Sequence, residues 1–392
     1  MPLNWQRVRL GDVAEIIGGG TPSTQITSFW SGSINWFTAT EIGITKYVYK
    51  SQRTITPLGL KKSSAKLLPI GTILLTSRAS IGDCAILKVV ATTNQDFQSL
   101  IPLEKINNEF LYYLTLTLKN KLLKLASGSI FLGVSPNKIK NLLIPLPPLN
   151  EQIAIANILS DLDRYLYALD ALILKKESVK KALSFELLSQ RKRLKGFNQN
   201  WQRVRLGDIC EFGNGGAYET LIVENGDFKL ISLNSIDIDG NLKNTMKRVN
   251  FYDNSLKQDD IVMVLSDVAH GDFLGLCAVI PSNDYVLNQR MGRLRKRNDC
   301  INILFLRLYI NANQKYFKMQ GQGSSQLNLS KKAIEDFEIL LPPLDEQAAI
   351  ANILSDVDSE ITSLKNKKRQ FENIKKALNH DLMSAKIRVL KK

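Results

Sequence analysis

The stretch LPPLNEQIAIANILSDLD at residues 146–163 decides the organisation of this chain, because it recurs as LPPLDEQAAIANILSDVD at residues 341–358. Fifteen of the eighteen residues are identical in the two copies. The pair of prolines ends the segment before it, since proline removes a backbone donor and restricts the preceding residue. Asn150 or Asp345 is then expected to cap a helix, and the glutamate that follows places a carboxylate in the first turn, where the helix dipole favours it.

Apolar residues continue from each stretch in alternating steps of four and three, which is the pattern of a heptad seam. The runs contain no Pro or Gly as far as Leu194 and the C-terminus, so each predicts a helix of about 40 residues and about 60 Å. Two such helices in one chain can bury their seams against each other, and their functional role is the spacing they impose. The seam comprises Ile155, Leu159, Leu162, Leu166, Leu169 and Ile173, and then Ile350, Leu354, Val357, Ile361 and Leu364.

Composition favours a nucleic-acid partner. The chain has 392 residues, enough for two or three domains, and a formal net charge of +15 from 52 Lys and Arg against 37 Asp and Glu. Such a surplus indicates a polyanionic partner, either nucleic acid or an anionic membrane. No apolar run approaches a membrane span, and the opening MPLNWQRVR lacks the apolar core of a signal peptide. We therefore expect nucleic acid, a cytoplasmic location and no membrane.

Cysteine and histidine spacing predicts no metal site. None of the four cysteines forms a CxxC pair or has a histidine nearby, and the chain has only two histidines. We interpret Cys84, Cys210, Cys277 and Cys300 as reduced and mostly buried.

A second repeat shows that the chain is a tandem duplication. NWQRVRLGD at 4–12 returns unchanged at 200–208, so each repeat is a globular block followed by a long helix. Gly196 fits the position just past the end of the first helix. The predicted segments are a first domain at 1–145, a central helix at 146–195, a second domain at 196–340 and a distal helix at 341–392.

The two blocks share a plan but little sequence. Each has two strands joined by a polar loop, then an Asn-Gln pair, an amphipathic helix, a second polar loop, a serine that caps a short helix, and a last strand. In the first block the two strands are expected at 71–77 and 84–93, the helix at 108–126 and the capping serine at Ser135. In the second block they are expected at 259–266, 275–281, 302–320 and Ser330. We expect an α/β fold of two mixed domains. Duplicated ends with divergent middles indicate one scaffold with two different readers, since unconstrained drift should also have blurred the ends.

No catalytic constellation is present in the sequence. The GxxxxGK[ST] phosphate loop is missing. GGG at 18–20 and FGNGG at 212–216 lack the frame of a dinucleotide or adenosyl site and are interpreted as turns. The Pro pairs lack the acceptor and aromatic residue of an amino-methyltransferase motif, and no nuclease grouping of carboxylates is found.

The polar loops remain as candidates for binding DNA. Arg forks read guanine, Asn and Gln amides read adenine, and Ser and Thr reach several acceptors. Any single one of these residues is more often a solvated loop residue, and Asn94 and Asn288 could equally be structural turn residues. The recurrence of three loops in both blocks is the informative feature. The candidates are Thr76, Ser77, Arg78, Ser80, Asn94, Gln95, Ser127 and Ser129, and then Ser266, Asp267, His270, Asn288, Gln289, Arg290, Arg293, Gln322, Ser324, Ser325 and Gln326.

Basic residues also gather between Arg290 and Arg297, where they would suit phosphate contacts, which position a protein without specifying sequence. Lysines late in each long helix are interpreted as a solvated or subunit-facing surface.

The whole arrangement resembles the specificity subunit of type I restriction–modification systems. The resemblance rests on the Pro-Pro-Leu-x-Glu-Gln helix start at Pro147–Gln152 and Pro342–Gln347. TSRASIGDCAI at 76–86 and TTNQDFQSLIP at 92–102 are also similar to a common form of the family's target-recognition domain. Of these two motifs, the second block retains only NQR at 288–290.

The resemblance implies a non-catalytic subunit in which each block reads one half of a bipartite double-stranded DNA target. The long helices would pair as an antiparallel coiled coil and hold the readers near one helical turn apart, roughly 34–36 Å. Two methyltransferase subunits would bind this chain, and restriction/translocase subunits would complete the assembly. S-adenosylmethionine, ATP and Mg would belong to those partners, with no cofactor in this chain.

Two alternatives stay open at this point. A coiled-coil interaction scaffold without DNA binding explains the helices but leaves the net charge and the duplicated loops without a cause. A self-contained methyltransferase or nuclease would need cofactor or metal motifs that the sequence does not show.

Overall fold

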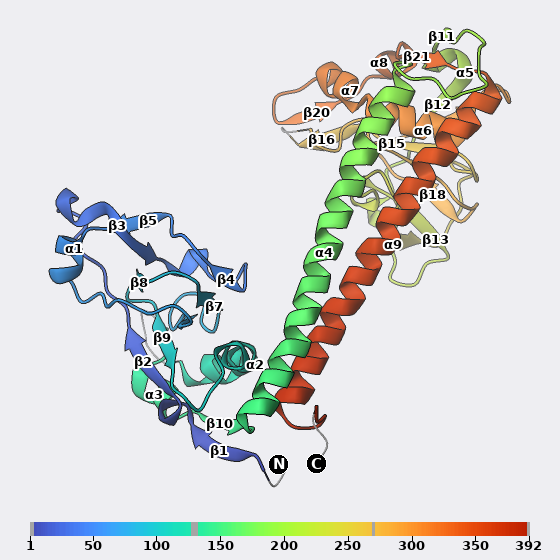
Figure 1. The fold of residues 1–392 in the computed structure, drawn as a ribbon. Helices are drawn as coiled ribbons and strands as arrows, with labels where there is room; N and C mark the ends of the chain where they lie inside the picture. Colours follow the sequence, from blue (N-terminus) through green and yellow to red (C-terminus); the bar gives the residue numbers. More distant parts are fainter. Residues whose placement is uncertain (1–3, 127–131, 269–270, 390–392) are drawn as a thin grey trace. The chain divides into compact units, whose positions relative to one another are not determined.

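The computed structural model describes residues 4–126, 132–268 and 271–389. Contacts divide the chain into two compact units, Met1–Ala171 with Asn366–Lys392, and Leu172–Lys365. Each unit contains one α/β domain together with a part of each long helix (Figure 1). The candidate residues Ser127, Ser129 and His270 lie outside the described residues.

The domain of the first unit combines ten strands with three short or medium helices in the described part of the chain. Its elements are β1 (Gln6–Arg9), β2 (Ala14–Gly18), β3 (Trp30–Phe37), β4 (Tyr47–Val48), β5 (Arg53–Ile55), α1 (Pro57–Lys61), β6 (Ile73–Leu75), β7 (Cys84–Leu87), β8 (Ala91–Thr93), β9 (Gln98–Pro102), α2 (Asn108–Leu125), α3 (Pro136–Lys140) and β10 (Leu143–Leu146). The main sheet has the order β2-β9-β6-β7-β4, and a second sheet has the order β5-β3-β8. Strand β1 pairs antiparallel with β10, so the repeated NWQRVR stretch is bonded to the strand before the Pro pair.

The domain of the second unit repeats this plan. Its elements are β11 (Gln202–Arg205), α5 (Leu206–Ile209), β12 (Cys210–Asn214), β13 (Phe228–Ile231), β14 (Lys247–Val249), β15 (Ile261–Val264), β16 (Ser266–Val268), β17 (Cys277–Val279), β18 (Tyr285–Leu287), β19 (Met291–Lys296), α6 (Ile303–Ala312), α7 (Gln314–Gln320), β20 (Gln326–Asn328), α8 (Lys331–Glu335) and β21 (Glu338–Leu341). The sheet β12-β19-β15-β17 corresponds to β2-β9-β6-β7, and β14-β13-β18 corresponds to β5-β3-β8. The predicted mixed α/β fold is confirmed in both blocks.

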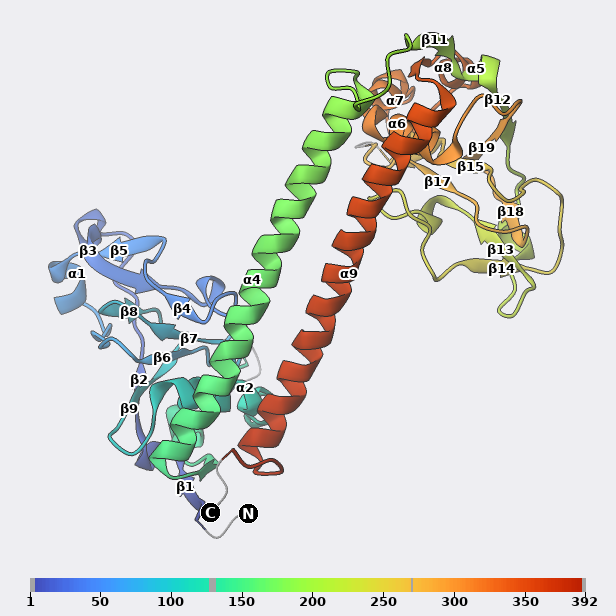
Figure 2. The ribbon, with the colours of Figure 1, turned by 45° about the vertical axis from the view of Figure 1, so that its right-hand side comes forward.

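The predicted long helices are α4 (Leu149–Leu188) and α9 (Leu344–Met383), each of 40 residues (Figure 2). The seam residues are buried or half-buried, as predicted. In the second unit Lys176 pairs with Glu360 at 2.7 Å and Lys180 with Asp358 at 2.5 Å. Because the partner's number falls as the lysine's number rises, the helices run antiparallel there.

The same direction holds in the first unit. Asp170 pairs with Lys368 at 2.6 Å, and Asp163 pairs with Lys375. Tyr165 and Phe371 pack with their ring centroids 4.7 Å apart. The antiparallel pairing of the two helices is therefore confirmed within each unit.

The Glu-Gln pair of the repeated stretch anchors each helix to its own domain. Gln152 accepts the Asn107 backbone N–H at 2.8 Å and donates to the Pro147 carbonyl at 2.9 Å. Gln347 makes the corresponding bonds to Asn302 at 2.8 Å and to the Pro342 carbonyl. Both glutamines are buried. A buried amide that satisfies donors and acceptors of two elements fixes their relative placement.

A buried lysine adds to this anchor in the first unit. The Lys46 ammonium lies 2.8 Å from the Tyr113 hydroxyl and 2.8 Å from the Ser160 hydroxyl of α4, and it pairs with Glu109. Its side chain is only 10% exposed, and burial lowers the pKa of Lys46 below its usual range. The loop before β4 is thus tied to both α2 and α4.

Three expectations about helix ends were wrong. Helix α4 begins at Leu149 and α9 at Leu344, so Asn150 and Asp345 lie inside the first turn and not at the cap position. The carbonyls of Pro148 and Pro343 accept first-turn N–H groups, and the Asn150 side chain accepts only the N–H of the next residue, Glu151, at 2.9 Å. Helix α4 also ends at Leu188, well before Gly196, because Gln190 adopts a left-handed conformation with φ +61°.

The helix predicted at 302–320 is divided into α6 and α7 at Asn313. The Asn313 amide donates to the Tyr309 carbonyl at 2.8 Å and its backbone N–H bonds the last carbonyls of α6. Asparagine competes in this way with the helical hydrogen bonds, which ends the first segment. The caps predicted at Ser135 and Ser330 are confirmed, since each hydroxyl accepts a first-turn N–H.

None of the helices in the described part of the chain is both long and apolar enough to cross a membrane.

Candidate nucleic-acid interface

Two of the predicted polar loops and the segment before α3 meet at one backbone position in the first unit. Ser77, just past the end of β6, donates its N–H to the Asp96 carbonyl at 2.7 Å. Its own carbonyl accepts the N–H of Val134 at 2.9 Å. The loop after β6, the Asn-Gln turn after β8 and the segment before α3 therefore lie side by side.

The second unit has the same junction at Leu265, just past the end of β15. The Leu265 N–H donates to the Arg290 carbonyl at 3.0 Å, and the Leu265 carbonyl accepts the Leu329 N–H at 2.8 Å. Two of the three positions differ in side-chain chemistry, with Ser77 against Leu265 and Asp96 against Arg290, and the third is aliphatic in both. Because the backbone makes the bonds, the arrangement persists although the sequences of the blocks have diverged.

A fourth loop joins each junction. The sequence analysis interpreted its glycine stretches only as turns, whereas Gly18 ends β2 and Gly213 lies within β12. Gly20 donates to the Thr93 carbonyl at 2.8 Å, and Gly216 donates to the Leu287 carbonyl at 3.1 Å. A Cβ on the glycine before each would lie 1.9 Å from the Asn94 oxygen and 2.1 Å from the Asn288 oxygen, so only glycine fits. The recurrence of a Gly-Gly pair ahead of an Asn-Gln pair in both blocks was the signal that could have predicted this contact.

Several predicted residues of the first block are buried at the junction with their side chains engaged. The Thr76 hydroxyl donates to the Ser80 carbonyl at 2.6 Å, and the Ser77 hydroxyl donates to the Asp96 carbonyl at 3.0 Å. The Asn94 amide donates to the Asp96 carboxylate at 2.8 Å. These side chains hold the loops in place.

The second block buries its counterparts in the same way. The Ser266 hydroxyl, 1% exposed, bonds Asn328 at 2.6 Å and also accepts from the Gln326 amide at 2.5 Å. The Asn288 carbonyl oxygen accepts the Tyr218 N–H at 3.1 Å. The Asp267 carboxylate accepts the Phe273 N–H at 2.7 Å.

Other predicted residues are exposed around the junctions. Arg78 and Arg290 are exposed, and neither guanidinium has an ion-pair partner within the described ranges. Arg290 adopts φ +68°, a conformation that a β-strand residue does not take, at the turn into β19. The remaining exposed or half-buried candidates are Ser80, Gln95, Gln289, Gln322, Ser324, Ser325 and Gln326.

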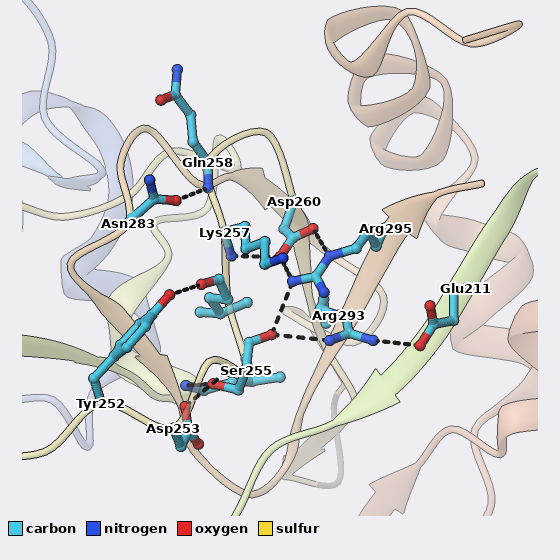
Figure 3. A network of polar contacts seen from close by, with 12 residues as sticks. Glu211, Tyr252, Asp253, Ser255, Lys257, Gln258, Asp260, Asn283, Arg293 and Arg295 are labelled. Carbon is cyan, nitrogen blue, oxygen red and sulfur yellow. Dashed lines mark hydrogen bonds and ion pairs between the residues drawn. The ribbon is translucent and has the colours of Figure 1, made fainter. Parts of the chain in front are cut away.

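The basic cluster after Arg290 is mostly engaged within the protein (Figure 3). Arg293, 13% exposed, bonds the Glu211 carboxylate at 2.8 Å and the Ser255 carbonyl at 3.1 Å. Arg295 forks onto the buried Asp260 carboxylate at 2.8 and 2.6 Å, and this carboxylate raises the pKa of Arg295. Both arginines hold the 251–260 segment on β19, and neither guanidinium is free to approach a phosphate in this arrangement.

No group of three or more His, Cys, Asp or Glu side chains that could hold a metal ion occurs in residues 4–126, 132–268 and 271–389.

Two α/β domains on antiparallel helices, with the same junction of four chain segments in each, define a tandem-repeat scaffold that carries two binding domains. A model of the type I restriction modification DNA specificity domain matches residues 2–177 and again residues 198–373. The chain belongs to this family.

Relatives with known names agree with this assignment. The type I restriction enzyme MjaVIII specificity subunit of Methanocaldococcus jannaschii is 27% identical over 99% of this chain and 94% of its own length. The MjaIX specificity subunit of the same organism is 40% identical over 42% of this chain and 39% of its own length. The EcoR124I/EcoR124II specificity subunit of Escherichia coli is 35% identical over 39% of this chain and 40% of its own length. The matches at higher identity thus span about two fifths of those relatives.

Solved structures show the same fold. The S subunit of a type I restriction–modification system from M. genitalium superposes with a TM-score of 0.62 at 20% identity, over 98% of each chain. The HsdS subunit from Thermoanaerobacter tengcongensis gives a TM-score of 0.56 at 19% identity, over 98% of this chain and 97% of that one. The family resemblance and the fold predicted from the sequence are confirmed.

Proposed function

We propose that this chain is the sequence-reading subunit of a type I restriction–modification complex, with each domain reading one half of a bipartite DNA target. The observation that carries the proposal is the backbone junction at Ser77 and Leu265. In both domains of a member of this family it brings together the loop after a buried strand, the Asn-Gln turn, the Gly-Gly loop and the segment before a short helix. A base edge is read by several side chains at once, so convergent loops are what such a reader needs.

The structure supports a division of labour among the candidate residues. The exposed side chains of Arg78, Gln95 and Arg290, and the half-buried side chain of Gln289, are suited to reach bases or phosphates. The candidates with engaged side chains would position them, and these are Thr76, Ser77, Asn94, Ser266, Asp267, Asn288 and Arg293. We retain the segment boundaries 1–145, 146–195, 196–340 and 341–392 for the two readers and the two helices.

The partners follow from the proposed role. The chain would bind double-stranded DNA and two methyltransferase subunits in the cytoplasm, and restriction/translocase subunits would join the assembly. S-adenosylmethionine, ATP and Mg would be held by those partners. This chain would itself perform no chemistry.

The test is the methylome of a cell that expresses this chain with its cognate methyltransferase subunit. Residues 209–340 are then replaced by the corresponding block of another family member. We expect a bipartite methylated motif in which one half changes and the other is retained. If no motif is methylated, or if the motif does not change when the block is replaced, the protein is instead a coiled-coil scaffold without DNA binding.

A point variant with a matched control sharpens this test. Arg78→Ala should weaken binding of the complex to duplex DNA and reduce its salt dependence, because a lost phosphate or base contact releases fewer counterions. Arg7→Ala removes an exposed arginine from β1, a strand that pairs with β10 and is not one of the four segments of the junction, and should change neither. Equal effects of both variants would mean that net charge, and not the junction, governs binding.

A further inference from the structure

The loop after β12 contains a carboxylate that holds two amides of the junction. Glu219 accepts the Asn288 amide N–H at 3.1 Å through one oxygen and the Gln289 amide N–H through the other. Glu219 is exposed, Gln289 is half-buried and Asn288 is 2% exposed. The glycine pair ahead of Glu219 brings this loop against the Asn-Gln turn.

The charge of Glu219 dictates which way the Gln289 amide faces. An ionised carboxylate only accepts hydrogen bonds, so Gln289 must turn its NH2 group toward it. The carbonyl oxygen of Gln289 then points away from the carboxylate, and it has no hydrogen-bond partner within the described ranges. Asn288 uses its own carbonyl oxygen on the Tyr218 N–H and has none to offer. Gln289 is therefore preset as an acceptor.

The first unit lacks this constraint. The corresponding amide, Gln95, bonds the hydroxyl of Thr21 in the loop after β2. A hydroxyl donates or accepts with equal ease, so Thr21 accommodates either orientation of the Gln95 amide. The two domains thus differ in whether the glutamine of the shared Asn-Gln turn has a fixed polarity.

We propose that Glu219 is a specificity-determining positioning residue, which fixes Gln289 to read the amino group of an adenine or a cytosine. In the major groove only the adenine N6 and cytosine N4 amino groups donate, whereas guanine O6 and thymine O4 accept. An acceptor at Gln289, backed by a negative charge, would be repelled by guanine or thymine on the strand it faces. This inference rests on the proposed DNA-reading function and concerns one position of one half-site.

The test is the methylome of the whole complex with Glu219→Gln. A neutral amide at 219 can donate to Gln289 as well as accept from it, so Gln289 can turn. We expect the half-site read by the second domain to admit guanine or thymine at one position where the parent requires adenine or cytosine. Discrimination there should fall about ten-fold, and the other half-site should be unchanged. Glu224→Gln is the matched control, because it removes the same charge from an exposed residue five positions further on.

A second variant, at Gln289, tests the reading group separately from Glu219. Gln289→Leu removes the reading group and should relax the same position that Glu219→Gln relaxes. Relaxation by Gln289→Leu with no change from Glu219→Gln would overturn the proposed role of Glu219. If Glu219→Gln abolished methylation, relaxation by Gln289→Leu would still support the reading role, and an unchanged motif would overturn it. A parent chain that gives no motif at all would instead refute the proposed function.

Discussion

Arg388 forms a fork on Glu151, with its Nε and a terminal nitrogen 2.8 and 3.1 Å from the two carboxylate oxygens, although 237 residues separate them. The indole of Trp5 donates to the same carboxylate at 3.1 Å. The second unit repeats the arrangement, with Arg193 and Trp201 bonded to Glu346 at 2.6 and 2.9 Å. The segment after α9 thus completes the first unit, and the segment after α4 completes the second.

Replacing Arg388 by alanine should destabilise the first unit selectively. Glu151 is 2% exposed, and removing the guanidinium would leave a buried carboxylate with the Trp5 indole as its remaining side-chain donor. We expect a loss of roughly 2 kcal/mol in the free energy of unfolding, the order of a charged hydrogen bond. Hydrogen exchange should show faster opening of the amides at the start of α4, with the second domain unaffected. Arg369→Ala, an exposed arginine of α9, is the control, and equal exchange in both variants would contradict the assignment.

A fragment that ends near Gly196 should pair with a second copy of itself. Alone it would leave the seam of α4 uncovered, while it carries Lys180 and Arg193, the repeat equivalents of Lys375 and Arg388. In a pair of fragments, Arg193 of one copy can take the place of Arg388 on Glu151 of the other. Sedimentation should give a dimer that Arg193→Ala weakens. A folded fragment that stays monomeric would rule this out.

One substitution should tighten that fragment dimer. In the full chain Tyr165 packs on Phe371, and the repeat-equivalent pair is Lys176 with Glu360. In the fragment dimer Tyr165 would face Lys176, so Lys176→Phe should restore the aromatic pair at two symmetric places, at about 1 kcal/mol each. In the full chain the same substitution removes a partly exposed ion pair and should cost less than about 1 kcal/mol. A fragment dimer that is weakened by Lys176→Phe would contradict the antiparallel register.

Lengthening both helices should lengthen the spacer of the DNA target. Seven residues inserted after Ala171 and seven after Lys365 add two helical turns, or about 10 Å, and keep every seam residue in phase. The methylated motif should gain about three base pairs between its halves, and both half-sites should stay the same. Insertions of three residues rotate the seam out of phase and should abolish methylation. An altered half-site after the seven-residue insertion would refute the role of the helices as a spacer.

The periodic and repeated features of the chain were predictable from the sequence, and its side-chain contacts were not. The spacing of the apolar residues from Ile155 to Ile173 predicts a helix because steps of three and four residues place their side chains on one helical face. The recurrence of the loops in both blocks indicates that the same segments meet in each domain. The contact of Arg293 with Glu211 joins residues 82 positions apart. The turn at Asn94 is held by the Phe37 carbonyl, which accepts the Asn94 N–H from a distant strand. No local pattern encodes either contact. The end of α4 was missed for a similar reason: Arg193 must leave the helix to reach Glu346, and that partner lies in the other repeat.

The four thiols should differ sharply in reactivity. Cys84, Cys210 and Cys277 are buried and Cys300 is exposed. Burial raises the pKa of Cys210 to about 12 and raises the pKa of Cys84 and Cys277 as well. Since the thiolate is the reactive form, an aromatic disulfide reagent at pH 8 should modify one thiol in the native chain and four in denaturant. Cys300→Ser should reduce the native count to zero.

The same shifts give a pH dependence of stability. A thiol whose pKa is higher in the folded state than in the unfolded chain contributes stability below the unfolded value of about 8.5, and loses it as the pH rises further. The free energy of unfolding should therefore fall between pH 8.5 and 11. Replacing the buried Cys277 by alanine should flatten this decline, whereas Cys300→Ser should not. A decline equally steep in all three chains would assign it to tyrosine or lysine titration instead.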